Sequence, residues 1–181
     1  MRRPHDFYPT PAWATEILVS RGITIHREHT ILEPCHGKGA ITNVLQQHGI
    51  KKVITNDIAL SSGTDYKLDA RYPGNWNYFH MEVGKLPITD WVITNPPFTD
   101  AIDIVKQSYH SANIGIAMLL RLSFLEPVNS RIEFLDNFPP TKLLILPRIS
   151  FTGNGKTDSV TCGWLIWEKH YPTHAIKVVR K

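Results

Sequence analysis

The stretch TILEPCHGKGAITNVLQQHGIKKVITND, residues 30–57, decides how the chain folds. Residues 30–34 form a short apolar run that is typical of a buried strand, and residues 38–49 have helical spacing and end at Gly49. A second apolar run, residues 51–57, predicts another strand. A strand, a helix and a strand in this order make a βαβ unit, in which the two strands lie parallel in one sheet.

The same alternation continues along the rest of the chain. Further strands are expected at residues 65–70, 90–95, 114–122, 142–147 and 159–169, and helices at residues 11–21, 101–112 and 130–138. Most of these strands are apolar throughout, which is the pattern of strands covered by helices on both faces. The sequence therefore predicts an α/β fold with a mostly parallel, seven-stranded sheet and helices on both faces.

The composition of the 181-residue chain is that of a soluble globular domain, with 42% hydrophobic and 20% charged residues. No apolar run approaches the ~18 residues that a membrane span needs. The N-terminal segment has no apolar run after its arginines, so we expect no secretory leader and a cytoplasmic protein without a membrane partner. The two cysteines, Cys35 and Cys162, make no disulfide framework. A net charge of +4 favours a polyanionic partner such as a nucleic acid.

Three polar clusters directly follow predicted strands. They are Glu33–Gly39 (EPCHGKG), Asn56-Asp57 and Asn95–Phe98 (NPPF). The carboxyl ends of parallel strands lie at one edge of the sheet, and ligands of open α/β sheets bind at that edge. The three clusters therefore predict one ligand-binding cleft.

The first cluster contains Gly37-x-Gly39, and glycine there allows a tight turn and a close approach of ligand to backbone. Asp57 follows 18 residues later, a spacing close to that of the acidic residue that binds ribose hydroxyls in nucleotide-binding βαβ units. The third glycine of the dinucleotide fingerprint is absent, because residue 42 is threonine, and the Walker spacing is absent too. The predicted ligand is therefore a nucleoside without a diphosphate.

Cys35 and His36 lie in the same turn. A Pro-Cys pair can supply a nucleophile, but a position within the glycine turn favours a small buried side chain for Cys35. The nine histidines show no metal-ligand spacing, so we interpret His36 as a turn residue and predict no metal.

The third cluster, Asn95-Pro96-Pro97-Phe98, contains the predicted catalytic residues. Two prolines cannot continue a central strand, because proline lacks the ladder donor, so they force the chain out of the sheet in an extended form. The Asn95 amide and nearby carbonyls are then fixed at the sheet edge, with the Phe98 ring beside them. This arrangement suits a planar substrate with an amino group, since the ring can stack on the substrate while the acceptors bind the amine hydrogens.

Together these motifs resemble the S-adenosylmethionine-dependent amino-methyltransferases, and most of all the phage-type DNA N6-adenine methyltransferases. The resemblance rests on DFYPTPAWATEIL at 6–18, EPCHGKG at 33–39, NPPF at 95–98 and LPRISFTGNGKT at 146–157. It implies a Rossmann-like class I methyltransferase fold, S-adenosylmethionine as cofactor, and direct displacement of the methyl group onto adenine N6 of DNA. His36 and Lys38 depart from the family pattern by adding bulk and charge beside the glycines.

The resemblance also implies a role for each matching residue. The cofactor's carboxylate end would contact Thr10 and Pro11, and its methionine portion would contact Glu33, Cys35, Gly37 and Gly39. Tyr8 and Asn95 would also belong to the cofactor site. The cofactor's nucleoside would contact Asp57 at the ribose, and Ile58 and Asp69 at the adenine. Asn95 and Pro96 would hold the target amine, and Phe98 would stack on the target ring.

Recognition of the nucleic acid is assigned to two segments, residues 70–89 and 147–159. Within them the expected contacts are Arg71, Trp76, Tyr78, Arg148 and Lys156. We expect residues 1–181 to form a single methyltransferase domain with no separate target-recognition domain. Such an enzyme would have low sequence specificity, prefer single strands, or take target recognition from a protein partner.

Three alternatives share the same motifs. The target could be adenine N6 in RNA, or the side-chain amide of a protein glutamine (N5). The short segment before the first predicted strand counts against the glutamine enzymes, which usually have an extra N-terminal helical domain. The third alternative is a non-catalytic methyltransferase-fold subunit that binds nucleic acid, and the intact glycine, Asp57 and NPPF motifs count against it.

Overall fold

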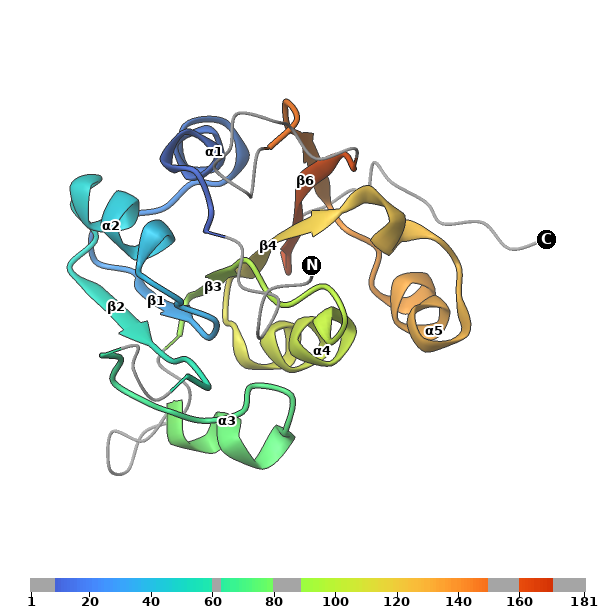
Figure 1. Cartoon of the computed structure of the whole chain (residues 1–181), viewed down its shortest axis with the longest axis horizontal. Helices are drawn as coiled ribbons and strands as arrows, with labels where there is room; N and C mark the ends of the chain where they lie inside the picture. Colours follow the sequence, from blue (N-terminus) through green and yellow to red (C-terminus); the bar gives the residue numbers. More distant parts are fainter. Residues whose placement is uncertain (1–8, 60–62, 80–88, 150–159, 171–181) are drawn as a thin grey trace.

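Strands and helices alternate in the computed structural model as the sequence predicts (Figure 1). The structure describes residues 9–59, 63–79, 89–149 and 160–170. In chain order the elements are α1 (Ala12–Ile17), the π-helical turn η2 (Leu18–Gly22), β1 (Thr30–Glu33), α2 (Ala40–Gln47), β2 (Lys52–Thr55), α3 (Pro73–Phe79), β3 (Trp91–Thr94), α4 (Ala101–Ser111), β4 (Gly115–Arg121), the 3-10 turn η3 (Leu122–Leu125), α5 (Asn129–Asn137), β5 (Lys142–Ile145) and β6 (Cys162–Glu168).

The strands form one sheet in the order β2-β1-β3-β4-β6-β5. The first four strands are parallel, and β6 runs antiparallel to both β4 and β5. The chain leaves β1 toward β2 on one side and leaves β3 toward β4 on the other, so the strand order reverses between β1 and β3. Ligands of open α/β sheets bind at such a reversal, beyond the carboxyl ends of the strands.

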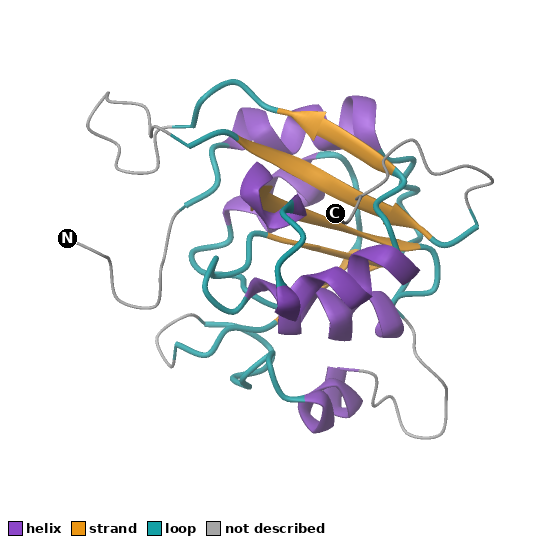
Figure 2. Ribbon diagram, turned by 90° about the vertical axis from the view of Figure 1, so that its right-hand side faces the viewer, coloured by secondary structure: helices purple, strands orange, loops and turns teal. Residues whose placement is uncertain are grey.

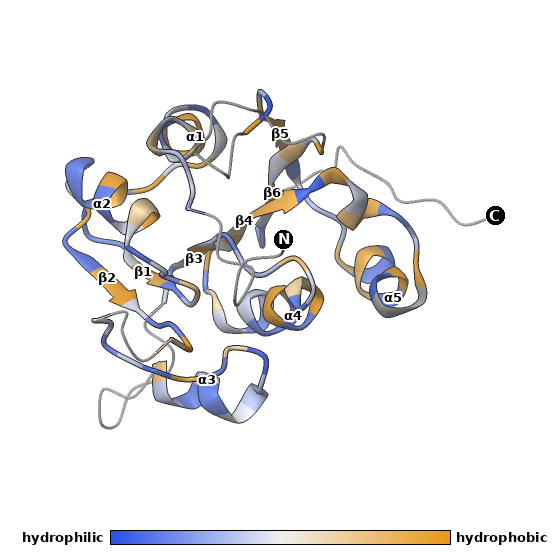
Figure 3. Ribbon diagram, in the orientation of Figure 1, coloured by the Kyte–Doolittle hydropathy of each residue, from blue (hydrophilic) through white to orange (hydrophobic). Residues whose placement is uncertain are grey.

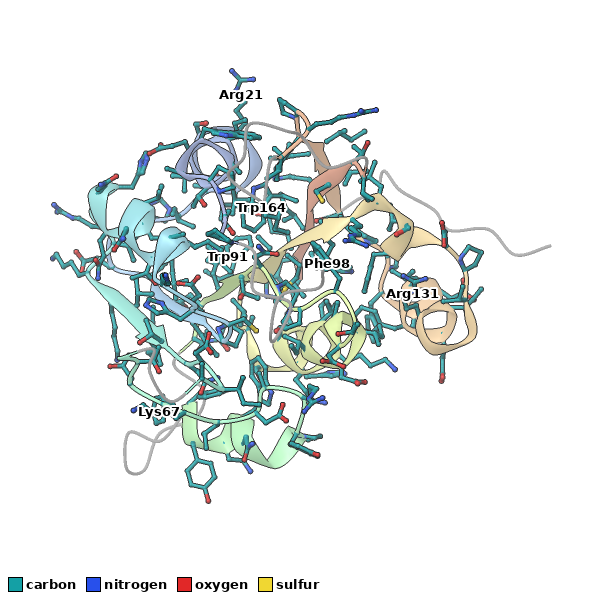
Figure 4. The ribbon with its side chains drawn as sticks, viewed as in Figure 1. Arg21, Lys67, Trp91, Phe98, Arg131 and Trp164 are labelled. Atoms are coloured by element: carbon teal, nitrogen blue, oxygen red, sulfur yellow. The ribbon has the colours of Figure 1, made fainter. Side chains whose placement is uncertain are left out.

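Helices cover both faces of the sheet, as predicted (Figure 2). Neighbouring residues of one strand point to opposite faces: Ile31 belongs to the core cluster that includes α1 and α2, and Leu32 to the cluster that includes α3, α4 and α5. Hydrophobic residues gather on the central strands (Figure 3), where Trp91 and Trp164 are fully buried (Figure 4). This two-sided burial explains why the central strands are apolar throughout.

The predicted strand at residues 65–70 is not formed, so the described sheet has six strands rather than seven. Only the bridge between Asn56 and Tyr66 remains of it. The reason lies in Asn56, whose side chain pairs with the backbone of Leu68 and takes the place of a strand ladder. Helix α3 is not predicted from the sequence, because its glycine and asparagines are typical of a loop. Its stability comes from burying Trp76 and Phe79 in the core.

Gly115 gives a stability test of the sheet. A Cβ atom at Gly115 would overlap the Trp167 carbonyl oxygen and lie 2.9 Å from the Trp91 ring. We expect Gly115→Ala to lower the free energy of unfolding by about 3 kcal/mol, the upper range for overpacked core sites. Gly74→Ala is the matched control, because a Cβ atom there meets nothing within 4 Å, and this helical site should gain about 0.5–1 kcal/mol. Urea unfolding measures both changes, and equal effects would contradict this packing.

Candidate active site

A cavity of about 440 Å³ lies where the loops after β1, β2 and β3 meet. This is the edge of the sheet at which the strand order reverses, and the volume is typical of a small-molecule site. The structure brings most of the predicted cofactor residues to its wall, together with two residues of the NPPF motif. These lining residues are Thr10, Glu33, Cys35, Gly37, Asp57, Ile58, Asp69, Asn95 and Pro97.

The glycine turn after β1 is tied to the end of β2. Gly37 and Gly39 have positive φ angles of 58° and 77°, which L side chains rarely adopt. The Gly37 backbone N–H donates to Asp57 Oδ2 at 2.7 Å, and the Ala59 N–H donates to Asp57 Oδ1 at 2.8 Å. Gly39 does not line the cavity. It lies directly before α2, so it contributes to the conformation of the turn rather than to the cavity wall.

Asn56 joins three segments around the cavity. Its buried amide Nδ2 donates to the carbonyl oxygens of Pro34 and Leu68, both at 2.9 Å, and its Oδ1 accepts from the Leu68 N–H at 2.8 Å. The loop after β1, the end of β2 and the segment before Asp69 are therefore held by one side chain. From the sequence, Asn56 belongs to a polar cluster but has no predicted role, although its position one residue before Asp57 is a signal for the site.

Glu33 is buried beneath the glycine turn with two partners that sequence reasoning missed. Its Oε2 accepts from the Thr42 backbone N–H at 3.2 Å and from the Thr42 hydroxyl, and it lies 3.0 Å from His36 Nδ1. Thr42 occupies the position of the third glycine in the dinucleotide fingerprint. The threonine at this position provides a hydroxyl donor to Glu33, which a glycine could not. His36 was predicted to be a turn residue alone, and its spacing of three residues from Glu33 was the signal for the pair.

The Glu33–His36 pair makes the stability of the fold depend on pH. The hydrogen bond with Glu33 raises the pKa of His36 above its ordinary value of 6.5, although burial opposes it, and burial also raises the pKa of Glu33. A raised pKa means that the folded state binds the proton more tightly than the unfolded chain. The stabilisation from His36 is therefore full below pH 6.5 and is lost as the pH rises through the raised pKa.

We expect the wild type to be more stable than His36→Gln at about pH 6, and this difference to narrow as the pH approaches about 9. Urea unfolding across this range measures the difference. His26→Gln is the control for losing a histidine, because His26 is exposed. A difference between wild type and His36→Gln that stays constant with pH would contradict the pairing.

Cys35 lines the cavity as a neutral thiol. Burial raises its pKa, and the charge of Asp57 raises it further. A protonated thiol is a poor nucleophile. Cys35 is therefore unsuited to a covalent role, and it is half-buried at the cavity wall rather than buried as predicted.

The NPPF segment leaves β3 with its residues on different sides. Asn95 and Pro97 line the cavity, whereas Pro96 is buried and Phe98 faces a neighbouring cavity. The Asn95 Nδ2 donates to Thr10 Oγ1 at 3.1 Å, which joins two predicted residues 85 positions apart. This bond fixes the orientation of the amide, with Oδ1 as its acceptor.

Asp69 and Arg71 form an ion pair at the wall of the cavity. Arg71 Nη2 donates to Asp69 Oδ2 at 2.6 Å and Arg71 Nε to Asp69 Oδ1 at 2.9 Å, and Arg71 Nη1 lies 3.6 Å from Asp100 Oδ2. The hydrogen bonds from Arg71 hold the pKa of Asp69 below its ordinary value. The structure thus gives Arg71 a place beside the predicted cofactor site, in addition to its predicted contact with nucleic acid.

The remaining predicted residues have varied positions. Trp76 is a correction, because it is 3% exposed and its indole N–H donates to the Ala70 carbonyl, so it serves the core rather than a nucleic acid. Tyr78 and Arg148 are exposed. Pro11 precedes α1 and does not line the cavity. Tyr8 and Lys156 lie outside the described residues.

Comparisons with solved structures identify the fold. No protein-family model matches the chain, and a search of curated proteins finds no relative. The structure is similar to class I S-adenosylmethionine-dependent methyltransferases, and at these identities the likeness shows the fold alone.

Three of these neighbours cover most of the chain. PH1948 from Pyrococcus horikoshii, a proposed RNA methyltransferase, has 15% identity and a TM-score of 0.59 over 91% of this chain and 87% of its own. The type I restriction-modification methyltransferase subunit from Streptococcus thermophilus has 14% identity and a TM-score of 0.63 over 92% of this chain and 46% of its own. The proposed class I S-adenosylmethionine-dependent methyltransferase lmo1582 from Listeria monocytogenes has 14% identity and a TM-score of 0.51 over 94% of this chain and 60% of its own. The chain thus spans less than half of the Streptococcus subunit.

None of the described helices is long and apolar enough to cross a membrane. In the part of the chain that the structure describes, no cluster of three or more histidine, cysteine, aspartate or glutamate side chains could hold a metal ion.

Proposed function

We propose that this chain is an S-adenosylmethionine-dependent methyltransferase whose target is the exocyclic N6 amine of adenine in DNA. The observation that supports it most is the meeting of Asp57 and Asn95 in one cavity at the reversal of strand order. Asp57 provides a carboxylate for a nucleoside, and Asn95 provides an amide acceptor for an amine.

The residues of the cavity fit S-adenosylmethionine. Ile58 is 47% exposed although it is apolar, and it lines the cavity, so it offers a surface for the adenine ring. Asp57 accepts backbone N–H groups with both oxygens, and each oxygen retains a second lone pair for a ribose hydroxyl. Asp69 would accept from the adenine amine, and the segments at Thr10 and Gly37 would hold the methionine portion. When bound, S-adenosylmethionine supplies a methyl group on an electrophilic sulfonium.

The NPPF segment would prepare the target amine. In a planar base the amine lone pair is delocalised into the ring, so the nitrogen is a weak nucleophile. Asn95 Oδ1, oriented by the bond to Thr10, and the Pro96 carbonyl would accept the two amine hydrogens and draw them out of the ring plane. The lone pair then becomes available for attack. Phe98 would stack on the target base. In the structure the planar Arg121 guanidinium lies over the Phe98 ring, with its central carbon 4.5 Å from the ring centre.

DNA is favoured over the alternatives by the sequence resemblance and by the likeness to a restriction-modification subunit. RNA adenine is the second candidate, because PH1948 matches nearly the whole of both chains. Protein glutamine is less favoured, and a non-catalytic subunit would not need the aligned amide of Asn95. We further propose that residues 1–181 act as one catalytic domain, with sequence recognition by a partner protein or not at all.

Two linked assays test this proposal. Calorimetry measures binding of S-adenosylmethionine, and a labelled methyl group then reports transfer to duplex DNA, single-stranded DNA, RNA or bulk protein. Cofactor binding with transfer to DNA supports the proposal. Methyl transfer to RNA or protein alone would show that RNA or protein, rather than DNA, is the substrate. Absence of cofactor binding would favour the non-catalytic alternative.

A further inference from the structure

A second cavity, of about 150 Å³, lies on the other side of the NPPF segment from the cofactor cavity. Thr99 borders both cavities, so the two adjoin at the end of the NPPF segment, where Pro97 lines the first cavity and Phe98 the second. Two arginines from different elements line the second cavity, Arg121 at the end of β4 and Arg131 in α5. Thr99 and Ser123 add hydroxyl groups, and no carboxylate is among its described lining residues.

Both guanidinium groups rest on aromatic rings that line the same cavity. The guanidinium carbon of Arg121 lies 4.5 Å from the centre of the Phe98 ring, and that of Arg131 lies 5.4 Å from the centre of the Phe124 ring. Figure 4 shows Phe98 and Arg131 among their neighbours. Stacking of this kind orients a guanidinium without using its hydrogen-bond donors. The donors of both arginines are thus positioned in advance for a ligand.

The Arg131 guanidinium has an unsatisfied hydrogen-bond donor in the described structure. Its Nε is buried without a hydrogen bond, and neither Arg131 nor Arg121 has a carboxylate within ion-pair distance among the described residues. A buried donor on a charged group is costly to leave unpaired. Two such cations in the lining of one cavity, with no carboxylate among its described lining residues, therefore indicate an anionic ligand.

We propose that this Arg121–Arg131 pocket binds a backbone phosphate of the nucleic acid strand, next to the nucleotide whose base is methylated. The pocket is smaller than the ~300 Å³ at which nucleoside-sized sites begin, so it suits a single small anionic group. Guanidinium forks match the geometry of phosphate oxygens. The inference rests on the proposed function, because it takes the substrate to be a nucleic acid.

The position of the pocket next to Phe98 suggests what a phosphate contact there would do. Phe98 belongs both to the pocket and to the predicted stacking site, so a phosphate held there lies beside the target base. Phosphate contacts fix register and orientation without reading sequence. The pocket would therefore position the target nucleotide against Asn95 in any sequence.

The test is the salt dependence of nucleic acid binding, which does not require turnover. Fluorescence anisotropy measures the affinity of a labelled single-stranded oligonucleotide at several salt concentrations for wild type, Arg131→Gln and Arg131→Lys. Arg21→Gln is the matched control, because Arg21 projects from the outer surface near α1 (Figure 4). Loss of one phosphate contact should reduce the slope of log affinity against log salt by about 0.7.

We expect Arg131→Gln to weaken oligonucleotide binding about tenfold or more and to reduce the slope, while Arg21→Gln changes neither. Arg131→Lys should keep the slope and lose part of the affinity, since lysine keeps the charge without the fork. Unchanged binding in Arg131→Gln, or weaker binding with an unchanged slope, would overturn the phosphate site. A wild type that binds no oligonucleotide would overturn it as well.

Methyl transfer is scored separately, so the two proposals can fail independently. A protein that shows the expected slopes but transfers no methyl group keeps the phosphate site and contradicts the proposed catalysis. A protein that methylates DNA with the same KM in wild type and Arg131→Gln keeps the catalysis and contradicts the phosphate site. Unfolding curves of each variant confirm that the compared proteins are folded.

Discussion

Replacing Asn95 by alanine is expected to lower kcat for methyl transfer by about 10²–10³-fold, the effect of removing one preorganised polar group from a reacting centre. The binding of S-adenosylmethionine should change little, because Asp57 and Gly37, which line the same cavity, would supply the proposed cofactor contacts. In the proposed mechanism the Asn95 amide would act on the amine hydrogens in the transition state and would add little to substrate binding before it. Steady-state kinetics with labelled cofactor measures kcat, and single-turnover kinetics isolates the methyl-transfer step.

Asn137→Ala is the matched control for Asn95→Ala. Asn137 is an exposed asparagine at the end of α5 whose side chain bonds to the Glu133 carbonyl within its own helix. We expect its replacement to leave kcat unchanged. If Asn95→Ala retained full kcat, or lost activity only through weaker cofactor binding, the proposed role of the NPPF segment would be wrong.

Replacing Asp57 by alanine is expected to weaken binding of S-adenosylmethionine by about 10–100-fold, since hydrogen bonds to charged groups contribute about 1.5–3 kcal/mol. Two effects combine. The cofactor loses the carboxylate for its ribose, and the Gly37 N–H loses the acceptor that holds the glycine turn at 2.7 Å. Calorimetric titration of the cofactor measures the change in Kd.

Asp57→Asn separates these two effects. An amide oxygen can still accept from the Gly37 N–H, so this variant keeps the turn and loses the charge. We expect its Kd to lie between those of wild type and Asp57→Ala. Asp103→Asn, an exposed aspartate in the first turn of α4, is the control for removing a negative charge. Equal affinity in Asp57→Ala and wild type would show that the cofactor binds elsewhere.

The sequence predicted the sheet where local pattern and burial agree. The apolar strands β1, β3 and β4 lie close to their predicted positions, because a strand buried on both faces leaves an apolar run. The helices α2 and α4 lie close to their predicted positions as well. Residues 65–70 had the alternation of a strand, but the Asn56 side chain satisfies the backbone there instead. Helix α3 lacks helical propensity and depends on burial of Trp76, which no local pattern reveals.

The candidate site was predictable at the strand ends and less so elsewhere. Topology alone places residues after β1, β2 and β3 at one edge, so Glu33, Asp57 and Asn95 could be grouped from sequence. The partners of those residues depend on three-dimensional packing. The bond between Thr10 and Asn95 spans 85 positions, and the two arginines of the second cavity come from separate elements. Neither arrangement leaves a spacing that can be read along the chain.

The position of the transferred methyl group tests the central proposal most directly. Single-stranded and duplex DNA are incubated with the protein and S-adenosylmethionine that carries a deuterated methyl group, and the DNA is then digested to nucleosides for mass spectrometry. We predict a deuterated methyl group on N6 of deoxyadenosine, present with wild type and lost with Asn95→Ala. A deuterated methyl group on a ring carbon, or unlabelled DNA from a protein that binds the cofactor, would contradict the proposal.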